Sequence, residues 1–200
     1  DGRIADGARI LDVGCGLGVL AALLAEAELC ASGAWPKSWL PPPARWTLHG
    51  FDVRASAIEA GRRALHDLPD RVTLEVGDAR RVALPVSDIA VIFDVLHYMD
   101  VAAQQSLLTR VHAALAPAGT LLLRVADARP DWRFRYTLAI DWLISFGRGM
   151  PWPRLHCRPL ADWHALLDAV GFSVTSQPMS DGTPFANVLL IATKSATKAR

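Results

Sequence analysis

The stretch Ile10-Leu-Asp-Val-Gly-Cys-Gly-Leu-Gly18 is the most informative part of this 200-residue sequence. Its apolar beginning has the pattern of a buried strand, its glycines stand at every second position, and an apolar helical pattern follows over residues 19–29. Glycine is required where the backbone takes a positive φ, or where a ligand lies against the chain without an intervening Cβ. Open parallel sheets bind ligands at the carboxyl ends of their strands, so this turn predicts a ligand site.

Short β-branched runs alternate with helical patterns on the C-terminal side of this turn. Strands are expected over residues 10–13, 47–53, 72–76, 89–93, 120–125, 172–175 and 187–193. Such alternation predicts right-handed crossovers and a mostly parallel sheet with helices on both faces. Residues 176–186 are too few for a helical crossover, so the last two runs should form an antiparallel hairpin. We therefore predict an α/β fold: a Rossmann-like, doubly wound sheet of seven strands, mostly parallel, with an antiparallel last strand.

Capping residues predict where several helices begin and end. Ser56-Ala-Ile-Glu59 has the capping-box pattern, which predicts a helix that begins after Ser56. Gly171 is expected to end a later helix. Asp100 is expected to cap a helix that ends at Pro117 and Gly119, with a buried stripe at Val101, Gln104, Leu107, Leu108, Val111 and Leu115.

Composition predicts one globular domain over residues 1–200, because 52% of the residues are hydrophobic and only 20% are charged. A net charge of +1 argues against a dedicated nucleic-acid binder.

The three cysteines fit neither a disulfide framework nor a zinc signature, which favours a reducing, cytoplasmic setting. We expect no transmembrane segment, because no apolar run approaches the ~18 residues that one requires. The chain begins with Asp1 rather than Met, as expected of a trimmed fragment.

Two segments interrupt the alternation. Residues 30–46 are rich in proline and tryptophan and are expected to form an inserted loop. Residues 127–159 hold six arginines and three aspartates, a net charge of +3, together with Trp132, Trp142 and Trp152. Residues 134–146 within this segment are expected to be a helix with Leu138, Trp142 and Ser145 on one face. The segment can cover an anionic or aromatic acceptor, or contact a membrane surface to collect a lipid-like one. Alternatively, its tryptophans pack on the domain and its arginines are solvated.

The glycine turn differs from the nicotinamide dinucleotide fingerprint, Gly-x-Gly-x-x-Gly. Val19 stands at the sixth position here, and the third glycine comes one residue early. Asp12, just before the turn, suits a positively charged ligand better than a pyrophosphate.

At this turn, at the ends of the second, third and fourth strands and at the turn into the fifth, the chain resembles the class I S-adenosylmethionine-dependent methyltransferases. The matching segments are Ile10-Leu-Asp-Val-Gly-Cys-Gly-Leu-Gly18, Gly50-Phe-Asp-Val53, Val76-Gly-Asp-Ala79, Phe93-Asp-Val-Leu-His-Tyr98 and Leu115-Ala-Pro-Ala-Gly-Thr-Leu-Leu-Leu123. The resemblance implies the same sheet topology that the alternation predicts, and S-adenosyl-L-methionine as the cofactor.

The resemblance also implies which residues hold that cofactor. Asp52 would bind both ribose hydroxyls, Asp78 would accept from the adenine amino group, and the Ala79 amide would meet the ring. Asp52 follows Gly18 by 34 residues, where about twenty are usual. Removing residues 31–45 restores the usual spacing. The full expected set is Asp12, Gly14, Cys15, Gly16, Gly18, Asp52, Val53, Asp78, Ala79 and Asp94, with Cys15 as a small side chain under the cofactor rather than a nucleophile.

Methyl transfer from a sulfonium is an in-line displacement, in which orientation alone is worth ~7–11 kcal/mol. It requires no metal and no covalent intermediate, and a general base helps only with a hydroxyl or an acidic C–H. His97, which follows the fourth strand, is the candidate base; the alternative is that it only shapes the pocket. Asp94-Val-Leu-His97 lacks the Asn/Asp-Pro-Pro-aromatic pattern of enzymes that methylate amino groups of bases.

The sequence therefore predicts a methyltransferase that acts on O or C of a small organic acceptor, which is anionic, aromatic or lipid-like. Two other classes stay open: a non-catalytic module that binds the cofactor, and an NAD(P)-dependent oxidoreductase. An RNA methyltransferase is disfavoured by the net charge of +1, so no nucleic-acid partner is expected.

Overall fold

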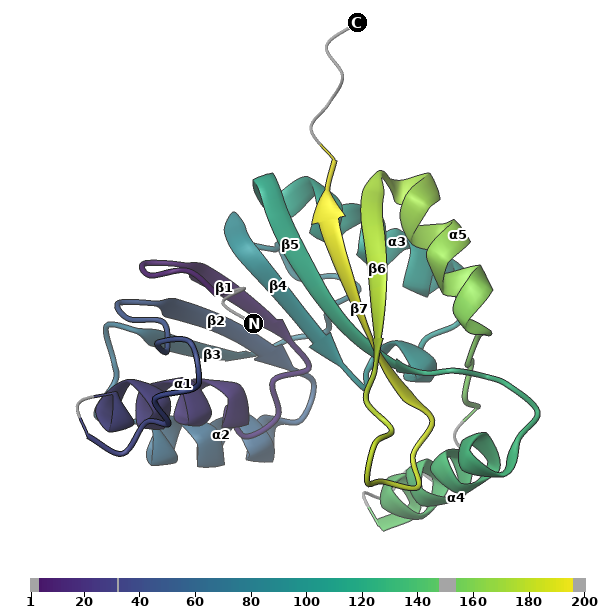
Figure 1. Ribbon diagram of the computed structural model, residues 1–200, viewed down its shortest axis with the longest axis horizontal. Helices are drawn as coiled ribbons and strands as arrows, with labels where there is room; N and C mark the ends of the chain where they lie inside the picture. Colours follow the sequence, from purple (N-terminus) through teal and green to yellow (C-terminus); the bar gives the residue numbers. More distant parts are fainter. Residues whose placement is uncertain (1–3, 32, 148–153, 196–200) are drawn as a thin grey trace, which may run out of the picture. The chain divides into compact units, whose positions relative to one another are not determined.

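The computed structural model describes residues 4–31, 33–147 and 154–195. The chain divides into two compact units, which we call the first and second units (Figure 1). The first unit comprises Asp1–Val91 and Ala114–Gly119, and the second comprises Ile92–Ala113 and Thr120–Arg200. The prediction of a single domain over residues 1–200 stays a prediction.

Seven strands form one sheet in the order β3-β2-β1-β4-β5-β7-β6. In the first unit, β1 (Arg9–Val13) pairs in parallel with β2 (Thr47–Asp52), and β2 pairs in parallel with β3 (Val72–Val76). The next strands are β4 (Ser87–Phe93) and β5 (Leu115–Ala126). In the second unit, β7 (Asn187–Lys194) pairs antiparallel with both β5 and β6 (Phe172–Pro178). This arrangement confirms the predicted fold class and the terminal hairpin.

Helices connect the parallel strands of the first unit. α1 (Val19–Cys30) follows β1, and α2 (Ala55–Ala64) follows β2 and packs on β2 and β3. α2 lies so close to the glycine turn that a Cβ on Gly61 would stand 2.7 Å from the Leu17 carbonyl oxygen. Leu11 and Leu48 are among the fully buried side chains of the core. Cys30 ends α1, and the described part of residues 31–46 has neither helix nor strand, as expected of an inserted loop.

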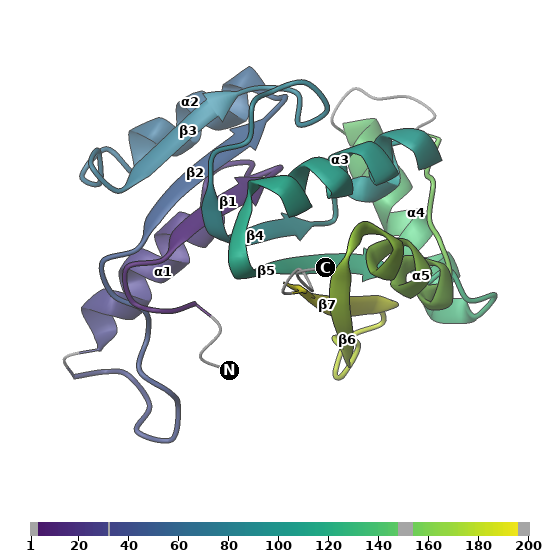
Figure 2. The same cartoon turned by 90° about the horizontal axis from the view of Figure 1, so that it is seen from above.

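The described residues of the second unit form a 3-10 turn, η1 (Leu96–Tyr98), and the helices α3 (Val101–Ala114), α4 (Trp132–Gly147) and α5 (Leu160–Val170). α5 runs alongside β6 (Figure 2). The Ala103 N–H donates to Asp100 Oδ1 at 2.8 Å, which confirms the predicted cap of α3. Gly171 ends α5 with a φ of 107°, as predicted.

The capping-box prediction at Ser56 is wrong. α2 begins at Ala55, and the Arg54 residue that precedes it makes no side-chain cap among the described residues. The Arg54 N–H donates instead to Asp52 Oδ1 at 2.9 Å. Because the end of β2 thus fixes the entry into the helix, α2 starts before Ser56 can cap it.

The predicted end of α3 is also wrong. The helix ends at Ala114, and Pro117 and Gly119 belong to β5, which begins at Leu115. Ala118 takes a φ of 60°, and a Cβ on Gly119 would stand 3.0 Å from the Asp88 carbonyl oxygen, so the start of this strand turns tightly. Val101 is 54% exposed and is not part of the buried stripe of α3.

Among the described residues, no helix is long and apolar enough to cross a membrane.

Candidate functional site

The glycine turn after β1 is anchored to the end of β2. Gly14, Gly16 and Gly18 have φ values of 77°, 57° and 75°. Such values favour glycine, because a Cβ clashes with the following carbonyl there. The N–H groups of Gly14 and Cys15 donate to the Phe51 carbonyl oxygen at 2.7 and 3.0 Å. The turn is therefore held beside the residue that precedes Asp52.

Asp52 is buried at the end of β2 and faces the turn. Its Oδ2 accepts from the Gly16 N–H at 3.0 Å, and its Oδ1 accepts from the Arg54 N–H at 2.9 Å and from Arg54 Nε at 3.2 Å. A Cβ on Gly16 would lie 3.2 Å from Arg54 Nη2 and 4.0 Å from Asp52 Oδ2. Because Gly16 has no side chain, the guanidinium of Arg54 can lie beside the carboxylate here.

Two other members of the predicted set have a packing reason for their residue type. A Cβ on Gly18 would lie 2.7 Å from Leu65 Cδ1 and 3.1 Å from Leu74 Cδ1, so only glycine lets α1 begin here. Cys15 is buried, and its Sγ lies 2.8 Å from where a Cβ on Gly50 would stand. Burial raises the pKa of the Cys15 thiol to about 12, so at neutral pH it is a packed thiol and not a nucleophile.

Asp12 is buried next to this turn. Burial, and secondly the negative charge of Asp52, raise the pKa of Asp12 to about 7. Two carboxylates in a poorly solvated place repel each other, and a cation placed near them would favour the ionised form of both. The pair therefore suits a ligand that carries positive charge.

Asp78 lies beyond the end of β3, on the same edge of the sheet as Asp52. The Gly77 N–H donates to the Asp52 carbonyl oxygen at 3.0 Å, which joins the two strand ends. Arg80 Nε and Nη2 hold the Asp78 carboxylate at 2.9 and 2.7 Å, and these hydrogen bonds keep the pKa of Asp78 below its ordinary value. Of the two neighbouring predicted residues, Ala79 is buried and Val53 is 66% exposed.

In the second unit, Asp94 follows β4 with a φ of 58°. Arg124 of β5 forms a two-point ion pair with its carboxylate through Nε and Nη2, and the Asp94 N–H donates to the Arg124 carbonyl oxygen at 3.3 Å. Arg124 also lies over the Phe93 ring, at 5.1 Å. Sequence reasoning missed Arg124, although an arginine within an otherwise apolar strand is a signal for a paired charge.

His97 is buried in η1, and its ring lies 4.1 Å from that of Tyr98. Its Nε2 has no hydrogen-bond partner among the described residues and stands 3.9 Å from Asp141 Oδ2. Burial lowers the pKa of His97 to about 4, against an opposing effect of the Asp94 charge. The imidazole is therefore neutral at pH 7, the form in which it can accept a proton.

α4 places Ser145 and Asp141 against this cluster. Thr137 and Ser145 are its buried side chains. Ser145 Oγ lies 3.4 Å from the Tyr98 hydroxyl oxygen, and Asp141 stands one turn before it. The prediction of a helix here is correct, and of the residues expected on one face, Ser145 is buried and Trp142 is 38% exposed. Sequence reasoning missed Thr137 and Asp141, whose partners Ala186 and His97 are more than forty residues away in the chain.

Several arginines of residues 127–159 form hydrogen bonds or ion pairs with other residues of the chain. Arg158 donates to Gln104 Oε1 at 2.7 Å and lies over the Trp163 ring. Arg129 pairs with Asp127 at 2.6 Å, and Arg133 Nη1 donates to the Ser180 carbonyl oxygen at 3.1 Å. Arg148 and Trp152 lie outside the described residues.

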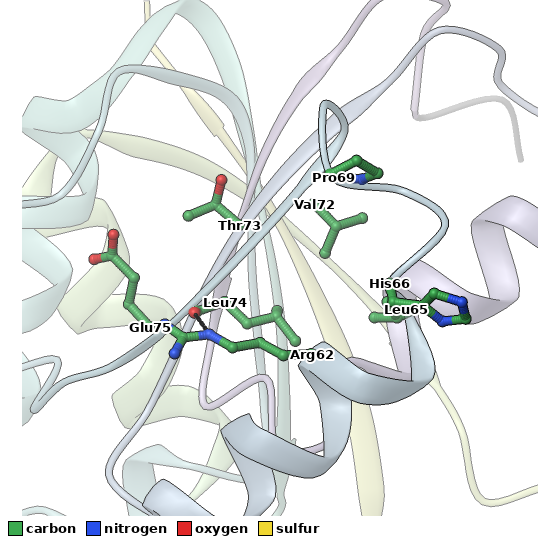
Figure 3. Close-up of a pocket in the computed structure, with 8 residues that line it drawn as sticks. All are labelled: Arg62, Leu65, His66, Pro69, Val72, Thr73, Leu74 and Glu75. Atoms are coloured by element: carbon green, nitrogen blue, oxygen red, sulfur yellow. Dashed lines mark hydrogen bonds between the residues drawn. The ribbon is translucent and has the colours of Figure 1, made fainter.

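A cavity of about 310 Å³ lies between α2 and the outer strand β3, lined by Arg62, Leu65, His66, Pro69, Val72, Thr73, Leu74 and Glu75 (Figure 3). Arg62 Nε donates to the Leu74 carbonyl oxygen there, at 2.8 Å. None of the predicted site residues lines this cavity, so we do not assign the site to it.

A strand order of 3-2-1-4-5-7-6 with β7 antiparallel, a glycine turn after β1 and acids at the ends of β2 and β3 define the class I S-adenosylmethionine-dependent methyltransferases. The chain matches the family described as "Methyltransferase domain" over residues 11–121, and it belongs to that family. This result confirms the predicted family.

Two curated relatives match the sequence. A carboxy-S-adenosyl-L-methionine synthase of Chromohalobacter salexigens is 30% identical over 127 residues, which cover 62% of this chain and 42% of that protein. A trans-aconitate 2-methyltransferase of Pseudomonas paraeruginosa is 33% identical over 144 residues, which cover 70% of this chain and 43% of that protein. The chain thus spans less than half of the length of either relative.

Among solved structures, that of the mitomycin 7-O-methyltransferase MmcR is similar in fold. It superposes with a TM-score of 0.70 at 24% sequence identity, covering 98% of this chain and 50% of that one. At this identity the likeness supports the fold alone.

Proposed function

We propose that this chain binds S-adenosyl-L-methionine and transfers its methyl group to an O or C atom of a small organic acceptor. The observation that carries the proposal is the contact between the Gly16 N–H and Asp52 Oδ2, because it sets a residue without a side chain against a buried carboxylate. A carboxylate in such a cradle suits the two neighbouring hydroxyls of a ribose. When bound, the cofactor supplies an electrophilic methyl group on a positively charged sulfur.

Each residue of the first unit has a separate part in this proposal. Asp52 binds the ribose hydroxyls, and Asp78 accepts a hydrogen bond from the adenine amino group. The buried charge of Asp12 favours the cationic part of the ligand. Gly14, Cys15 and Gly16 let it approach the backbone, and Val53 and Ala79 complete the part of the set that lies in this unit.

His97 is the proposed general base. Its imidazole is neutral at pH 7, and its Nε2 has no hydrogen-bond partner among the described residues. With a pKa of about 4 it is a weak base, so it contributes most where the acceptor's own proton is acidic. Asp141, at 3.9 Å, would stabilise the imidazolium that forms.

The acceptor is proposed to be small and anionic. Residues 127–159 carry a net charge of +3 and would cover it. One curated relative is named for trans-aconitate, a carboxylate, which agrees with an acceptor of this class. We also propose a cytoplasmic location, supported by three free cysteines, Cys15, Cys30 and Cys157.

Calorimetry with S-adenosyl-L-methionine and with S-adenosyl-L-homocysteine tests the cofactor. Asp52→Ala should weaken binding at least tenfold while far-ultraviolet circular dichroism stays unchanged. Asp88→Ala, which removes the partner of Arg9 elsewhere in the first unit, is the matched control and should bind normally. Equal affinity of the wild type and Asp52→Ala would refute the assignment.

Turnover separates an enzyme from a non-catalytic cofactor-binding module. Release of S-adenosyl-L-homocysteine is measured with a panel of carboxylates, phenols and amines. A methylated carboxylate or phenol supports the proposal. Cofactor binding without turnover of any acceptor in the panel would favour the non-catalytic module, and methylation of amines alone would contradict an O or C acceptor.

A further inference from the structure

α4 differs from an ordinary surface helix, which turns its apolar stripe to the core, because its two buried side chains, Thr137 and Ser145, are polar and several of its apolar side chains are exposed. Thr137, Asp141 and Ser145 recur every four residues, so they share one side of the helix. The Ala186 N–H donates to Thr137 Oγ1 at 3.0 Å, and Ser145 Oγ lies 3.4 Å from the Tyr98 hydroxyl oxygen. Figure 1 shows α4 beside the β6–β7 connection, which holds Ala186. These contacts fix which side of α4 faces inward.

The opposite side of α4 is apolar and exposed. We call it the outer face, and it consists of Trp132, Tyr136, Trp142, Leu143 and Phe146. Trp132, Leu143 and Phe146 are 62–63% exposed, and Tyr136 and Trp142 are about 40% exposed. These positions recur at steps of three, four and seven residues, so they form one stripe along the helix. A contiguous exposed apolar stripe marks an interaction surface.

Two arginines lie on and beside the outer face, and the carboxylate of Asp131, directly before Trp132, accepts from the Phe134 N–H at 2.8 Å. α4 has three charged residues, and Arg135, which is exposed, is the one on the outer side. Arg133 lies over the Trp132 ring at 5.4 Å, next to the face. The acid of the helix, Asp141, is on the inner side, where it approaches His97. Exposed tryptophan, phenylalanine and leucine with adjacent arginine are typical of a helix that lies in the headgroup region of a membrane.

We propose that the outer face of α4 binds the surface of an anionic lipid bilayer. The two tryptophans and Tyr136 would sit at headgroup level, Leu143 and Phe146 would enter the acyl boundary, and Arg135 would meet lipid phosphate. This inference does not depend on the proposed catalytic function.

A second copy of the chain is the other occupant to consider, and the size of the face argues against it. A fully exposed aromatic side chain offers at most ~250 Å². At the observed exposures, the five side chains together offer less than the ~800 Å² that each partner of a standard interface buries. A bilayer sets no such minimum, because it adapts to the surface that inserts.

Vesicle flotation with the full chain tests the proposal. Vesicles of phosphatidylcholine alone are compared with vesicles of phosphatidylcholine and phosphatidylglycerol in equal parts. We expect binding to the anionic vesicles, at least tenfold weaker with the double variant Leu143→Gln/Phe146→Gln and about fivefold weaker with Arg135→Gln. The matched control is Leu23→Gln/Leu29→Gln on α1, whose leucines are 62% and 73% exposed, and it should bind like the wild type.

Three outcomes would overturn the proposal. The first is no binding to either kind of vesicle, and the second is an equal loss of binding in the α1 control. The third is a dimer, detected by light scattering of the lipid-free chain, that Leu143→Gln/Phe146→Gln converts to monomer. That result would assign the outer face to a second copy. Circular dichroism of each variant shows whether its fold is kept.

Discussion

Arg54 Nε donates to Asp52 Oδ1 at 3.2 Å, on an oxygen that already accepts from the Arg54 N–H. The other oxygen, Oδ2, accepts from the Gly16 N–H. A carboxylate offers about four acceptor positions, so three of those on Asp52 are taken. The Arg54 side chain therefore competes with any ligand that uses both oxygens.

We predict from this that Arg54→Ala tightens the binding of S-adenosyl-L-methionine. Arg54 has a side chain that is 39% exposed, and solvent screening limits such a pair to about 1 kcal/mol, so the gain should not exceed about fivefold. Calorimetry measures it. Arg9→Ala, which breaks the pair with Asp88, is the control and should leave the affinity unchanged. Weaker binding by Arg54→Ala would mean that the guanidinium itself contacts the ligand.

Asp12 should make cofactor binding depend on pH near neutrality. Its pKa of about 7 in the folded chain means that it loses its proton as the pH rises through 7, and the ionised form attracts a cationic ligand. Affinity should therefore rise between pH 6 and pH 8, and Asp12→Asn should be weaker and flatter. Isothermal titration at three pH values checks both effects, and an unchanged slope in Asp12→Asn would contradict them.

The same carboxyl has the opposite effect on the free chain. Because its pKa is raised from 3.8, the folded state binds more protons than the unfolded state between pH 3.8 and 7, so its contribution to stability falls as the pH rises through that window. At pH 8, Asp12→Asn removes a buried charge and should raise the melting temperature of the ligand-free chain. A lower melting temperature at pH 8 would show that the carboxylate makes stabilising contacts.

The sheet and the glycine turn could be predicted because they depend on local patterns. β-branched runs give the strands, and a glycine with positive φ is visible as a residue type. The start of α2 could not be predicted in this way. It depends on the Arg54 N–H, which donates to Asp52 on the previous strand, so the helix begins before Ser56. The inner face of α4 could not be predicted either, since the partner of Ser145 is Tyr98, 47 residues earlier in the chain. The periodicity of apolar residues carries no information about a polar side chain whose partner is distant in the sequence.

Buried His97 should make the fold sensitive to acid. Its pKa is lowered from 6.5 to about 4, so the unfolded state binds more protons between these values, and this contribution to stability is lost as the pH falls from 6.5 toward 4. His97→Gln should therefore lose less stability than the wild type between pH 7.5 and pH 5, as measured by urea denaturation. His66→Gln, at a side chain that is 72% exposed, should behave like the wild type. Parallel losses in His97→Gln and the wild type would contradict the assignment.

Among the glycines of the turn, Gly18 should lose the most stability when a methyl group is added by substitution with alanine. Gly18→Ala places a Cβ 2.7 Å from Leu65 Cδ1 and 3.1 Å from Leu74 Cδ1, in a backbone with a φ of 75°. The left-handed conformation costs about 1–2 kcal/mol and overpacking about 1–3 kcal/mol, so we expect a loss of roughly 2–5 kcal/mol in the free energy of unfolding. Gly7→Ala separates the two effects, because Gly7 has a φ of 74° with nothing within 4 Å of its added Cβ. Urea denaturation of both variants should show a clearly larger loss for Gly18→Ala, and equal losses would mean that Leu65 and Leu74 move aside freely.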